Sequence, residues 1–421
     1  KLPSREPAAG DSRGARVSDD GRRVTFVSTA PNLVVGDTND QQDVFVASLD
    51  AGPPAISRVS VAADGTGGDG SSGGAVLSAD GEVVALYSNA TNLVEEPVSG
   101  AAQIYRVSEA RSEPLTRITP DCPDCDSLEL IDTIDLSADG NRLVMSTRRQ
   151  FLPAEDEDAS GADIYLWDAT EGLSVQSLSS TGGNGTRFFG VNAFFPTISS
   201  NGRFIGFRSG AADLALPPLT VENWHAYVRD VDGPVLTRVS QMHGGTANCD
   251  GTDPRASGSS SPVIAADGNV AAFHSECAFV LPGDEPMDTN GLQDVFVRSI
   301  AEMTTRRISL TEDGEEADGA SQIAEISDDG RYVLFTSDAT NLVPDDTNAA
   351  RDLFLHDRMT RTTTRISYDR EYGQLPDGIV VGGGGAGLST GGRFAVYATA
   401  NPISPTDLNP GADVYLVQLR P

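Results

Sequence analysis

The sequence predicts an all-β protein, a seven-bladed β-propeller with four antiparallel strands in each blade. A turn motif of the Ser-x-Asp-Gly type recurs seven times at intervals of 59–66 residues, and the same order of short strands follows each copy. We find no helical periodicity. Because a four-stranded sheet with apolar side chains on both faces buries them only against neighbouring sheets, one closed ring accounts for 421 residues better than several separate domains.

The turn between the first and second strands marks each blade. Asp-Gly between two extended segments is a strong hairpin signal, because both residues tolerate turn conformations. Four clean copies and three degenerate copies occur, and their positions are Ser18-Asp19-Asp20-Gly21, Ser78-Ala79-Asp80-Gly81, Ser137-Ala138-Asp139-Gly140, Ser199-Ser200-Asn201-Gly202, Ala265-Ala266-Asp267-Gly268, Ser327-Asp328-Asp329-Gly330 and Ser389-Thr390-Gly391-Gly392.

The strands after each turn carry a fixed pattern of large side chains. Five residues past the turn glycine, the second strand holds Phe26, Leu86, Met145, Phe207, Phe273, Phe335 and Tyr397. The third strand holds an aromatic residue in every copy: Phe45, Tyr105, Tyr165, Tyr227, Phe296, Phe354 and Tyr415. The fourth strand ends in Arg-Val-Ser or a related triplet: Arg58-Val59-Ser60, Arg117-Ile118-Thr119, Ser177-Leu178-Ser179, Arg238-Val239-Ser240, Arg307-Ile308-Ser309 and Arg365-Ile366-Ser367.

We therefore predict a single domain over residues 1–421, with blades starting near residues 13, 74, 131, 194, 260, 322 and 384. The seventh blade reaches its third strand at 412–419 and has no residues left for a fourth. We expect residues 1–12, and Lys1–Arg5 in particular, to supply this outer strand and close the ring, since Pro3 is tolerated on a free edge. The alternative is a frayed N-terminus and an open blade.

The repeat resembles the WD40-like PD40 repeat of TolB-type propellers. The segments that carry the resemblance are 327–335, SDDGRYVLF, and 341–348, NLVPDDTN, and the likeness extends over nearly the whole chain. The resemblance implies the fold, and it says little about function because this repeat family serves many roles.

Composition excludes two kinds of partner. The chain has 61 acidic and 30 Lys and Arg residues, a formal charge of −31, without any run of basic residues. Nucleic acid and anionic membrane surfaces repel such a chain. No stretch of about 18 apolar residues is present, so no transmembrane segment is expected. The chain begins at Lys1, and we expect a processed protein that is exported to the periplasm or the cell exterior.

An acidic motif, Asp-x-Asn-x-x-x-Asp, recurs in the loops between second and third strands. Carboxylate and amide oxygens on one tight loop are ligands that calcium prefers. The candidate calcium ligands are Asp37, Asn39 and Asp43; Asp288, Asn290 and Asp294; Asp346, Asn348 and Asp352; and Asp407, Asn409 and Asp413. The alternative is that these side chains only cap their own turns and anchor the third strand. The partial copies end at Gln103, Asp163 and His225.

Four cysteines predict two disulfides in an exported acidic chain, Cys122–Cys125 and Cys249–Cys277. A zinc site is a weaker alternative, because nothing in the repeat brings the two pairs together. Redox chemistry at Cys122 is also disfavoured, because no helix is expected there.

Catalytic signals are poor. Two G-x-S-x-G matches, at 10–14 and 70–74, precede strands and lack the helix that a nucleophile elbow needs. The four histidines, His225, His243, His274 and His356, are too few for a histidine-rich metal site, and packing or surface roles are expected for them. A non-repeated cluster of polar residues in one blade would favour an enzyme, and the nearest candidate is the group of Trp224, His225, His243 and Arg208 in blade four.

The sequence thus favours an exported, non-catalytic scaffold that binds a protein partner or assembly through its acidic loop face, with calcium as a structural ion. The alternative is a polysaccharide lyase or hydrolase that acts at the mouth of the channel. No catalytic residue can be assigned in either case.

Overall fold

The computed structural model describes residues 8–50, 54–96, 98–108, 114–121, 131–152, 161–177, 193–211, 214, 224–241, 258–260, 262–277, 288–369, 373–380, 386–401, 403 and 411–419. All regular elements in this part of the chain are β-strands, which confirms the all-β prediction. The same residues contain no helix that is long and apolar enough to cross a membrane.

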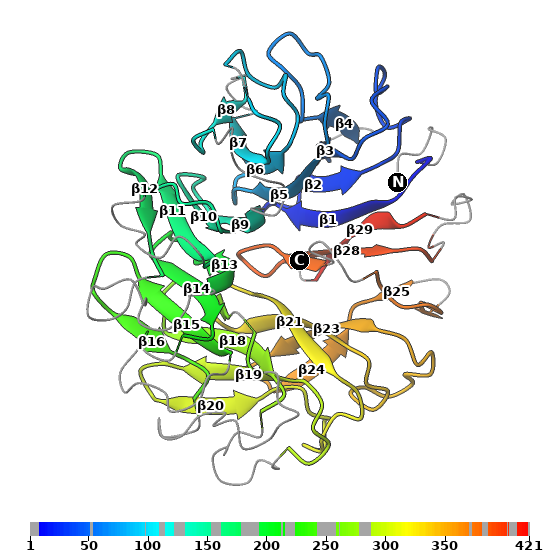
Figure 1. Ribbon diagram of the computed structural model, residues 1–421. Helices are drawn as coiled ribbons and strands as arrows, with labels where there is room; N and C mark the ends of the chain where they lie inside the picture. Colours follow the sequence, from blue (N-terminus) through cyan, green and yellow to red (C-terminus); the bar gives the residue numbers. More distant parts are fainter. Residues whose placement is uncertain are drawn as a thin grey trace. The chain divides into compact units, whose positions relative to one another are not determined.

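The chain forms two compact units, and the first comprises residues 1–131, 138–140 and 367–421. Its sheets are blades one, two and seven (Figure 1). Blade one contains β1 (Ser12–Val17), β2 (Arg23–Ser28), β3 (Asp43–Ser48) and β4 (Ala55–Arg58). Blade two contains β5 (Ser72–Leu77), β6 (Val83–Ser88), β7 (Gln103–Ser108) and β8 (Thr116–Arg117). Blade seven contains β27 (Ala386–Leu388), β28 (Phe394–Thr399) and β29 (Asp413–Gln418), and the small pair β25 (Tyr368–Asp369) and β26 (Gly373–Gln374) precedes it.

The second unit comprises residues 132–137 and 141–366 and holds blades three to six. Blade three contains β9 (Ile131–Leu136), β10 (Arg142–Thr147), β11 (Asp163–Asp168) and β12 (Gly172–Val175). Blade four contains β13 (Ala193–Ile198), β14 (Phe204–Ser209), β15 (His225–Asp230) and β16 (Leu236–Arg238). Blade five contains β17 (Val263–Ile264), β18 (Val270–Ser275), β19 (Asp294–Ser299) and β20 (Thr304–Arg307). Blade six contains β21 (Ser321–Ile326), β22 (Tyr332–Ser337), β23 (Asp352–Asp357) and β24 (Thr362–Arg365).

The seven sheets confirm the predicted seven-bladed β-propeller class, with four antiparallel strands in six blades and three in blade seven among the described residues. In every blade the predicted large residue of the second strand pairs directly with the predicted aromatic residue of the third. The pairs are Phe26–Phe45, Leu86–Tyr105, Met145–Tyr165, Phe207–Tyr227, Phe273–Phe296, Phe335–Phe354 and Tyr397–Tyr415. Such cross-strand pairs fix the register of a sheet and fill the space between sheets.

One fourth-strand assignment was wrong. In blade three Tyr165 pairs with Val175, as Phe45 pairs with Arg58 in blade one, so the equivalent triplet is 175–177 and not Ser177-Leu178-Ser179. The serine of this shifted triplet makes the hydrogen bond that marks the end of the fourth strand in the other blades, Ser177 Oγ to Asp163. Blade three therefore has a valine where five other blades have arginine.

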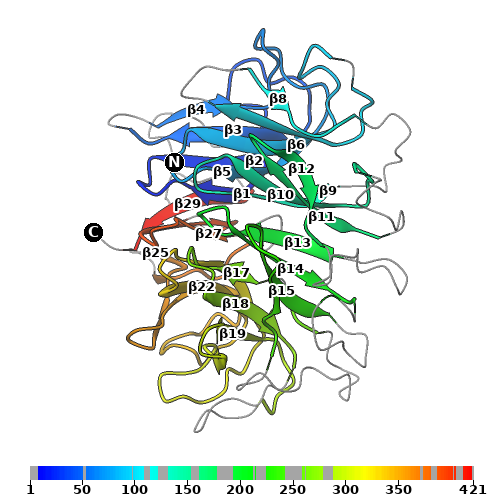
Figure 2. The same cartoon turned by 90° about the vertical axis from the view of Figure 1, so that its left-hand side faces the viewer.

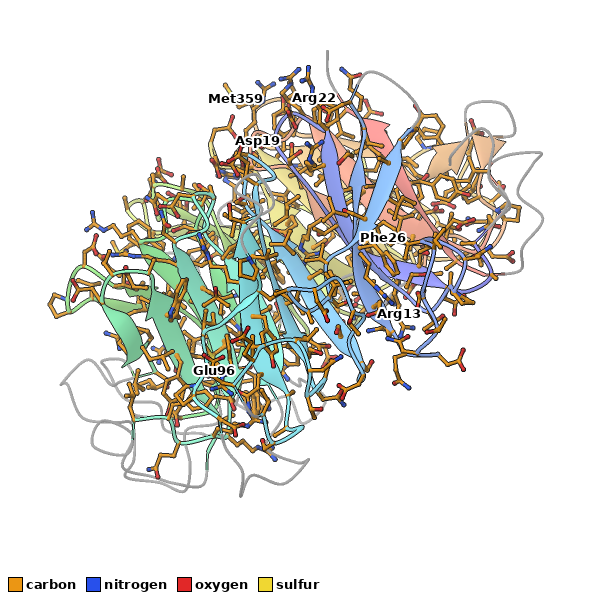
Figure 3. The ribbon with its side chains drawn as sticks, turned by 90° about the horizontal axis from the view of Figure 1, so that it is seen from above. Arg13, Asp19, Arg22, Phe26, Glu96 and Met359 are labelled. Atoms are coloured by element: carbon orange, nitrogen blue, oxygen red, sulfur yellow. The ribbon has the colours of Figure 1, made fainter. Side chains whose placement is uncertain are left out.

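The turn serine ties the hairpin together, as at Ser18, whose hydroxyl donates to Asp20 at 2.7 Å and accepts the N–H of Arg23 at 3.0 Å. Gly21 has φ +72°, and a Cβ there would lie 2.7 Å from the ring of Phe394 in blade seven. Only glycine satisfies both the left-handed backbone and this close approach. Figure 3 shows Asp19 and Arg22 at one end of blade one and Arg13 at the other, with Phe26 between them.

Blades one and seven of the first unit lie side by side (Figures 1 and 2). The N–H of Ser12 donates to the carbonyl of Ala412 at 2.7 Å, and the N–H of Ala412 donates to Asp11 Oδ1 at 3.0 Å. No residue of β29 is fully buried, whereas the first four residues of the equivalent strand β3 are. Because residues 1–7 lie outside the described part, closure of the ring by an N-terminal strand stays a prediction.

Candidate functional site

A recurrent clasp joins the start of the third strand to the end of the fourth. The hydroxyl of Ser60 donates to the fully buried Asp43 at 2.5 Å and accepts the N–H of Val44 at 3.2 Å. Other blades repeat the contact with Asp163 and Ser177 at 2.5 Å, Asp294 and Ser309 at 2.6 Å, Gln103 and Thr119 at 2.8 Å, and His225 and Ser240 at 3.2 Å. The last residue of the predicted acidic motif therefore anchors the third strand, as the capping alternative proposed.

In blade one an arginine lies among the predicted metal ligands. Nη1 of Arg58 lies 3.0 Å from Asp37 and 3.3 Å from Asp43. The amide of Asn39 donates to Asp43 at 3.0 Å and to the carbonyl of Gly68 at 2.8 Å. Burial raises the pKa of Asp37, the nearby Asp43 raises it further, and Arg58 opposes both. The three motif residues are thus brought together, but around a guanidinium of the same blade.

Blade six repeats this arrangement. Arg365 Nη1 lies 3.4 Å from Asp346 Oδ1, and the amide of Asn348 donates to Asp352 at 3.0 Å. In blade seven Asp413 is the first residue of β29 and is partly exposed, while Asp407 and Asn409 lie outside the described residues.

Blade five departs from the other copies because it has a third carboxylate. Arg307 Nη1 lies 2.6 Å from Asp294 and 2.8 Å from Glu316, and both the arginine and Asp294 are almost completely buried. The backbone N–H and hydroxyl of Thr289 also donate to Glu316, at 3.0 and 2.7 Å. At the equivalent position blade one has Gly67, which leaves that loop one carboxylate short.

The third member of this group is Asp288, which accepts the N–H of Gly291 at 3.0 Å through Oδ1. Its other oxygen, Oδ2, is buried and has no hydrogen-bond partner in the described part of the chain. One oxygen each from Asp288, Asp294 and Glu316 lie within 4.8 Å of one another, so these three form a candidate acidic metal-binding triad. With Arg307 the group has a formal charge of −2. Asn290, the remaining predicted ligand, donates instead to the carbonyl of Ala317 at 2.8 Å.

Electrostatics differ among the three carboxyl groups. Burial raises the pKa of Asp288, and Asp294 and Glu316 raise it further. Burial also raises the pKa of Asp294 against the effect of Arg307. For Glu316 burial is outweighed by the hydrogen bonds from Thr289 and Arg307, which lower its pKa to about 2. The triad therefore combines a firmly ionised carboxylate with two that a nearby cation would help to ionise.

The sequence analysis missed the arginines and Glu316. Arg58, Arg307 and Arg365 were recognised as markers of the fourth strand but not as charge partners of the loop, which precedes them by about 20 residues. The joint occurrence of both motifs in blades one, five and six was the signal available. Glu316 follows the fourth strand of one blade only and gave no such signal.

The histidines fit packing roles where the structure describes them. Burial lowers the pKa of His225, His274 and His356 to about 4, so all three are neutral near pH 7. His356 Nδ1 lies 3.0 Å from the hydroxyl of Thr363 in the neighbouring strand. His243 lies outside the described residues.

Of the four cysteines only Cys277 is described, and it is buried in an apolar cluster with Phe273 and Phe296. Cys122, Cys125 and Cys249 lie outside the described residues, so the pairs Cys122–Cys125 and Cys249–Cys277 remain a prediction. Alkylation of the native protein followed by mass spectrometry tests the pairing, and four modified thiols would contradict it.

Solved structures with similar folds have low sequence identity to this chain. An oligogalacturonate lyase in complex with manganese matches at 13% identity and a TM-score of 0.53, over 100% of this chain and 96% of that one. The oligogalacturonate lyase of Vibrio parahaemolyticus matches at 11% identity and 0.53, over 99% and 92%. The acylaminoacyl peptidase of Pyrococcus horikoshii matches at 14% and 0.50, over 97% of this chain but only 51% of the peptidase.

A putative TolB from Agrobacterium tumefaciens also matches, at 17% identity over 70% of this chain and 79% of that one, with a TM-score of 0.38. No protein-family model matches the chain, and no curated protein does. The structural likenesses therefore establish the β-propeller fold that this chain shares with lyases and peptidase propellers, and the fold alone.

Proposed function

We propose that this chain is an exported, non-catalytic scaffold, in the periplasm or outside the cell, that binds a protein partner through the acidic loop ends of its blades. The observation that favours this function is that the carboxylates of the loops fall into two groups with different contacts. Some hold the loops in place by internal hydrogen bonds, and others are exposed and make no such bond among the described residues.

Internal contacts link two of these loops to the next blade of the same unit. Asp69 accepts the N–H and the hydroxyl of Thr91, both at 2.6 Å, and Asp318 accepts the same two groups of Thr340 at 2.6 and 2.7 Å. Asn92 donates to the carbonyl of Gly67 at 2.9 Å. Loops that are fixed before binding lose little conformational entropy when a partner docks, which favours a binding role.

The exposed carboxylates give each unit an acidic surface at these loop ends. In the first unit they are Asp40, Glu95 and Glu96, and in the second they are Glu312, Asp313 and Asp345. A partner with a basic surface would complement them, and such complementarity mainly raises the association rate. Salt should weaken the complex, because exposed charges are screened.

Capture from a native envelope fraction tests this function with matched variants. We expect Glu95→Gln with Glu96→Gln, or Glu312→Gln with Asp313→Asn, to reduce capture of the partner. Glu82→Gln with Glu302→Gln, which removes two exposed acids from the turns at the other end of the strands, should leave it unchanged. Equal capture by both sets would contradict a role for the loop face.

We also propose that the triad of Asp288, Asp294 and Glu316 takes calcium as a structural ion. The three groups offer only oxygen ligands, which suit a hard divalent cation, and their charge exceeds that of Arg307 by two. In blades one and six a single arginine already balances all but one of the charges, so the proposal for Asp37, Asn39, Asp43, Asp346, Asn348 and Asp352 has less support.

Thermal unfolding with calcium and with a chelator tests the ion. A ligand of the folded state stabilises by mass action, so millimolar calcium should raise the melting temperature. Glu316→Gln should remove most of the increment, and Asp346→Asn in blade six serves as the matched control that retains it. The calcium proposal would be wrong if calcium does not raise the melting temperature of the wild type, or if the rise persists in Glu316→Gln. Asp288 and Asp294 would then have only a structural role.

The second candidate function is a polysaccharide lyase. Two structures with matching folds are oligogalacturonate lyases, and one of them holds manganese. Incubation with oligogalacturonate and manganese, followed by ultraviolet detection of unsaturated products, distinguishes this function from a scaffold.

A further inference from the structure

Blade four contains a cluster of one arginine and three aromatic residues. The strands β13, β14 and β15 lie side by side (Figures 1 and 2), and Arg208 on β14 is paired in register with Phe194 on β13. The guanidinium carbon of Arg208 lies 4.7 Å from the ring centre of Phe195 and 4.9 Å from that of Trp224. The ring of Trp224 in turn contacts Phe194, with centroids 5.8 Å apart.

The backbone of Phe195 is unusual. It lies at a β-bulge with φ +52°, where the equivalent bulges of blades one and two have Gly14 at +63° and Gly74 at +59°. A bulky side chain rarely adopts this conformation, and such strained residues concentrate at functional sites. Phe195 is also 44% exposed, so burial of its ring does not offset the strain.

Arg208 has no counter-ion among the described residues. No carboxylate there forms an ion pair with it, and its buried Nε has no hydrogen-bond acceptor. Burial lowers the pKa of Arg208, and no acid of the described residues opposes this effect. A second arginine of the blade, Arg203, also stacks on a ring, that of Phe204 at 5.2 Å, but its two nitrogens donate to Asp230 at 2.8 Å each. Arg208 therefore lacks the acceptor that Arg203 has.

We propose that Phe195, Arg208 and Trp224 bind an organic carboxylate that carries a flat apolar body. The rings of Phe195 and Trp224 both lie within 5 Å of the guanidinium carbon, but aromatic rings do not replace the oxygen acceptors that its N–H donors match in a carboxylate. The exposed ring of Phe195 offers an apolar surface to the rest of the ligand. This site does not depend on the proposed role of the acidic loops.

The neighbouring His274 of blade five carries no charge near pH 7, and Glu276 of the same blade is close enough to affect it. His274 is sufficiently close for Arg208 to influence it, but burial, and then Arg208, lower its pKa to about 4. Its Nδ1 accepts the N–H of Ile323 at 3.3 Å. Because the imidazole is neutral, the charge partner of the ligand carboxylate at this site would be Arg208.

Titration of the whole chain with benzoate, followed by calorimetry and by the fluorescence of Trp224, tests the site. Benzamide, which has the same ring without the charge, is the matched probe. We expect benzoate to bind at millimolar concentration and benzamide not to bind. Arg208→Gln should weaken benzoate binding at least about tenfold, because a charged hydrogen-bonded pair is lost, and Arg203→Gln should not change it.

Phe195→Gly separates binding from structure. It restores the residue found at the equivalent bulges, so the melting temperature should not fall, while benzoate binding should weaken. A cluster with only a structural role would lose stability and have no affinity to lose. Absence of benzoate binding in the wild type, equal binding of benzamide, or binding that survives Arg208→Gln would each overturn the proposal.

Discussion

The charge of Arg307 compensates the carboxylates of the loop that it contacts. Its side chain is fully buried between Asp294 and Glu316, and loss of one member of a buried ion pair leaves the other without compensation. We expect Arg307→Met to destabilise the protein by about 3–5 kcal/mol, measured from the midpoint of urea unfolding. The matched control is Arg203→Gln, which breaks the more exposed pair with Asp230 and should cost about 0–1 kcal/mol.

A second arm of this experiment removes the stranded charges. Adding Asp294→Asn and Glu316→Gln to Arg307→Met should recover part of the loss, because the buried carboxylates are then neutral. If the triple variant is no more stable than the single one, the loss comes from packing around the arginine and not from its charge.

The buried histidines predict how stability depends on pH. In the folded chain His225, His274 and His356 have pKa values of about 4, against 6.5 when unfolded. Between these values the unfolded chain binds more protons, so stability should rise with pH from about 4 to 6.5 and be complete above that. Urea unfolding at a series of pH values measures this.

A matched variant identifies the groups responsible. His356→Gln should make the slope between pH 4 and 6.5 shallower. Asp357→Asn removes a group whose pKa is lowered, first of all by its hydrogen bond from Arg331, so it should lower stability at every pH above about 4 and change the slope only below that value. A slope that His356→Gln leaves unchanged would contradict the assignment.

At the scale of the element, the β-bulges in the first strands of blades one and two each have a glycine with positive φ. Gly74 has φ +59°, and a Cβ there would lie 2.3 Å from the ring of Tyr87. Gly74→Ala should therefore cost both backbone strain, about 1–2 kcal/mol, and overlap, about 1–3 kcal/mol. Gly172 is the control. Its φ is +82°, but a Cβ there would have no atom within 4 Å, so Gly172→Ala should lower stability only by the backbone strain. If Gly74→Ala and Gly172→Ala lower the melting temperature equally, overlap with Tyr87 does not contribute to the loss of stability.

The elements also show how far the sequence determines this fold. The turn motif and the aromatic residues were sufficient to predict all seven blades, because they fix the register of the second and third strands directly. The outer strand of blade three was misplaced since serines at both 177 and 179 match the triplet, and only the pairing of Tyr165 with Val175 separates them.

The candidate site was less predictable. The spacing of Asp288 and Asp294 correctly brought them together, but nothing local indicates that Arg307 reaches back into the loop or that Glu316 joins it. Such contacts depend on how a fourth strand and the following loop fold over the third. The same limit applied to Arg208 and Phe195, whose contact depends on a bulge that the sequence pattern does not reveal.

At the scale of the whole molecule, the remaining question is how the first unit completes blade seven. Contacts of Ser12 and Asp11 with Ala412 bring the start of the described chain beside β29. We expect deletion of residues 1–7 to lower the melting temperature, because β29 would lose an outer neighbour. Replacement of the same residues by a Gly-Ser segment of equal length is the control that separates pairing from chain length. An unchanged melting temperature after deletion would favour the open blade.

The serine clasp also bears on how the molecule responds to mechanical load. In blade one the chain leaves the outer strand at Ser60 and continues directly into the next blade, so a pull along the chain meets the bond between Ser60 and Asp43 before it reaches the backbone bonds of β4. Hydrogen bonds to an ionised group are about twice as strong as neutral ones. Each clasp thus resists peeling of its fourth strand, and a stretched chain should release its blades in discrete steps. The smallest forces are expected at blades two and four, whose clasps, Gln103 with Thr119 and His225 with Ser240, join neutral groups.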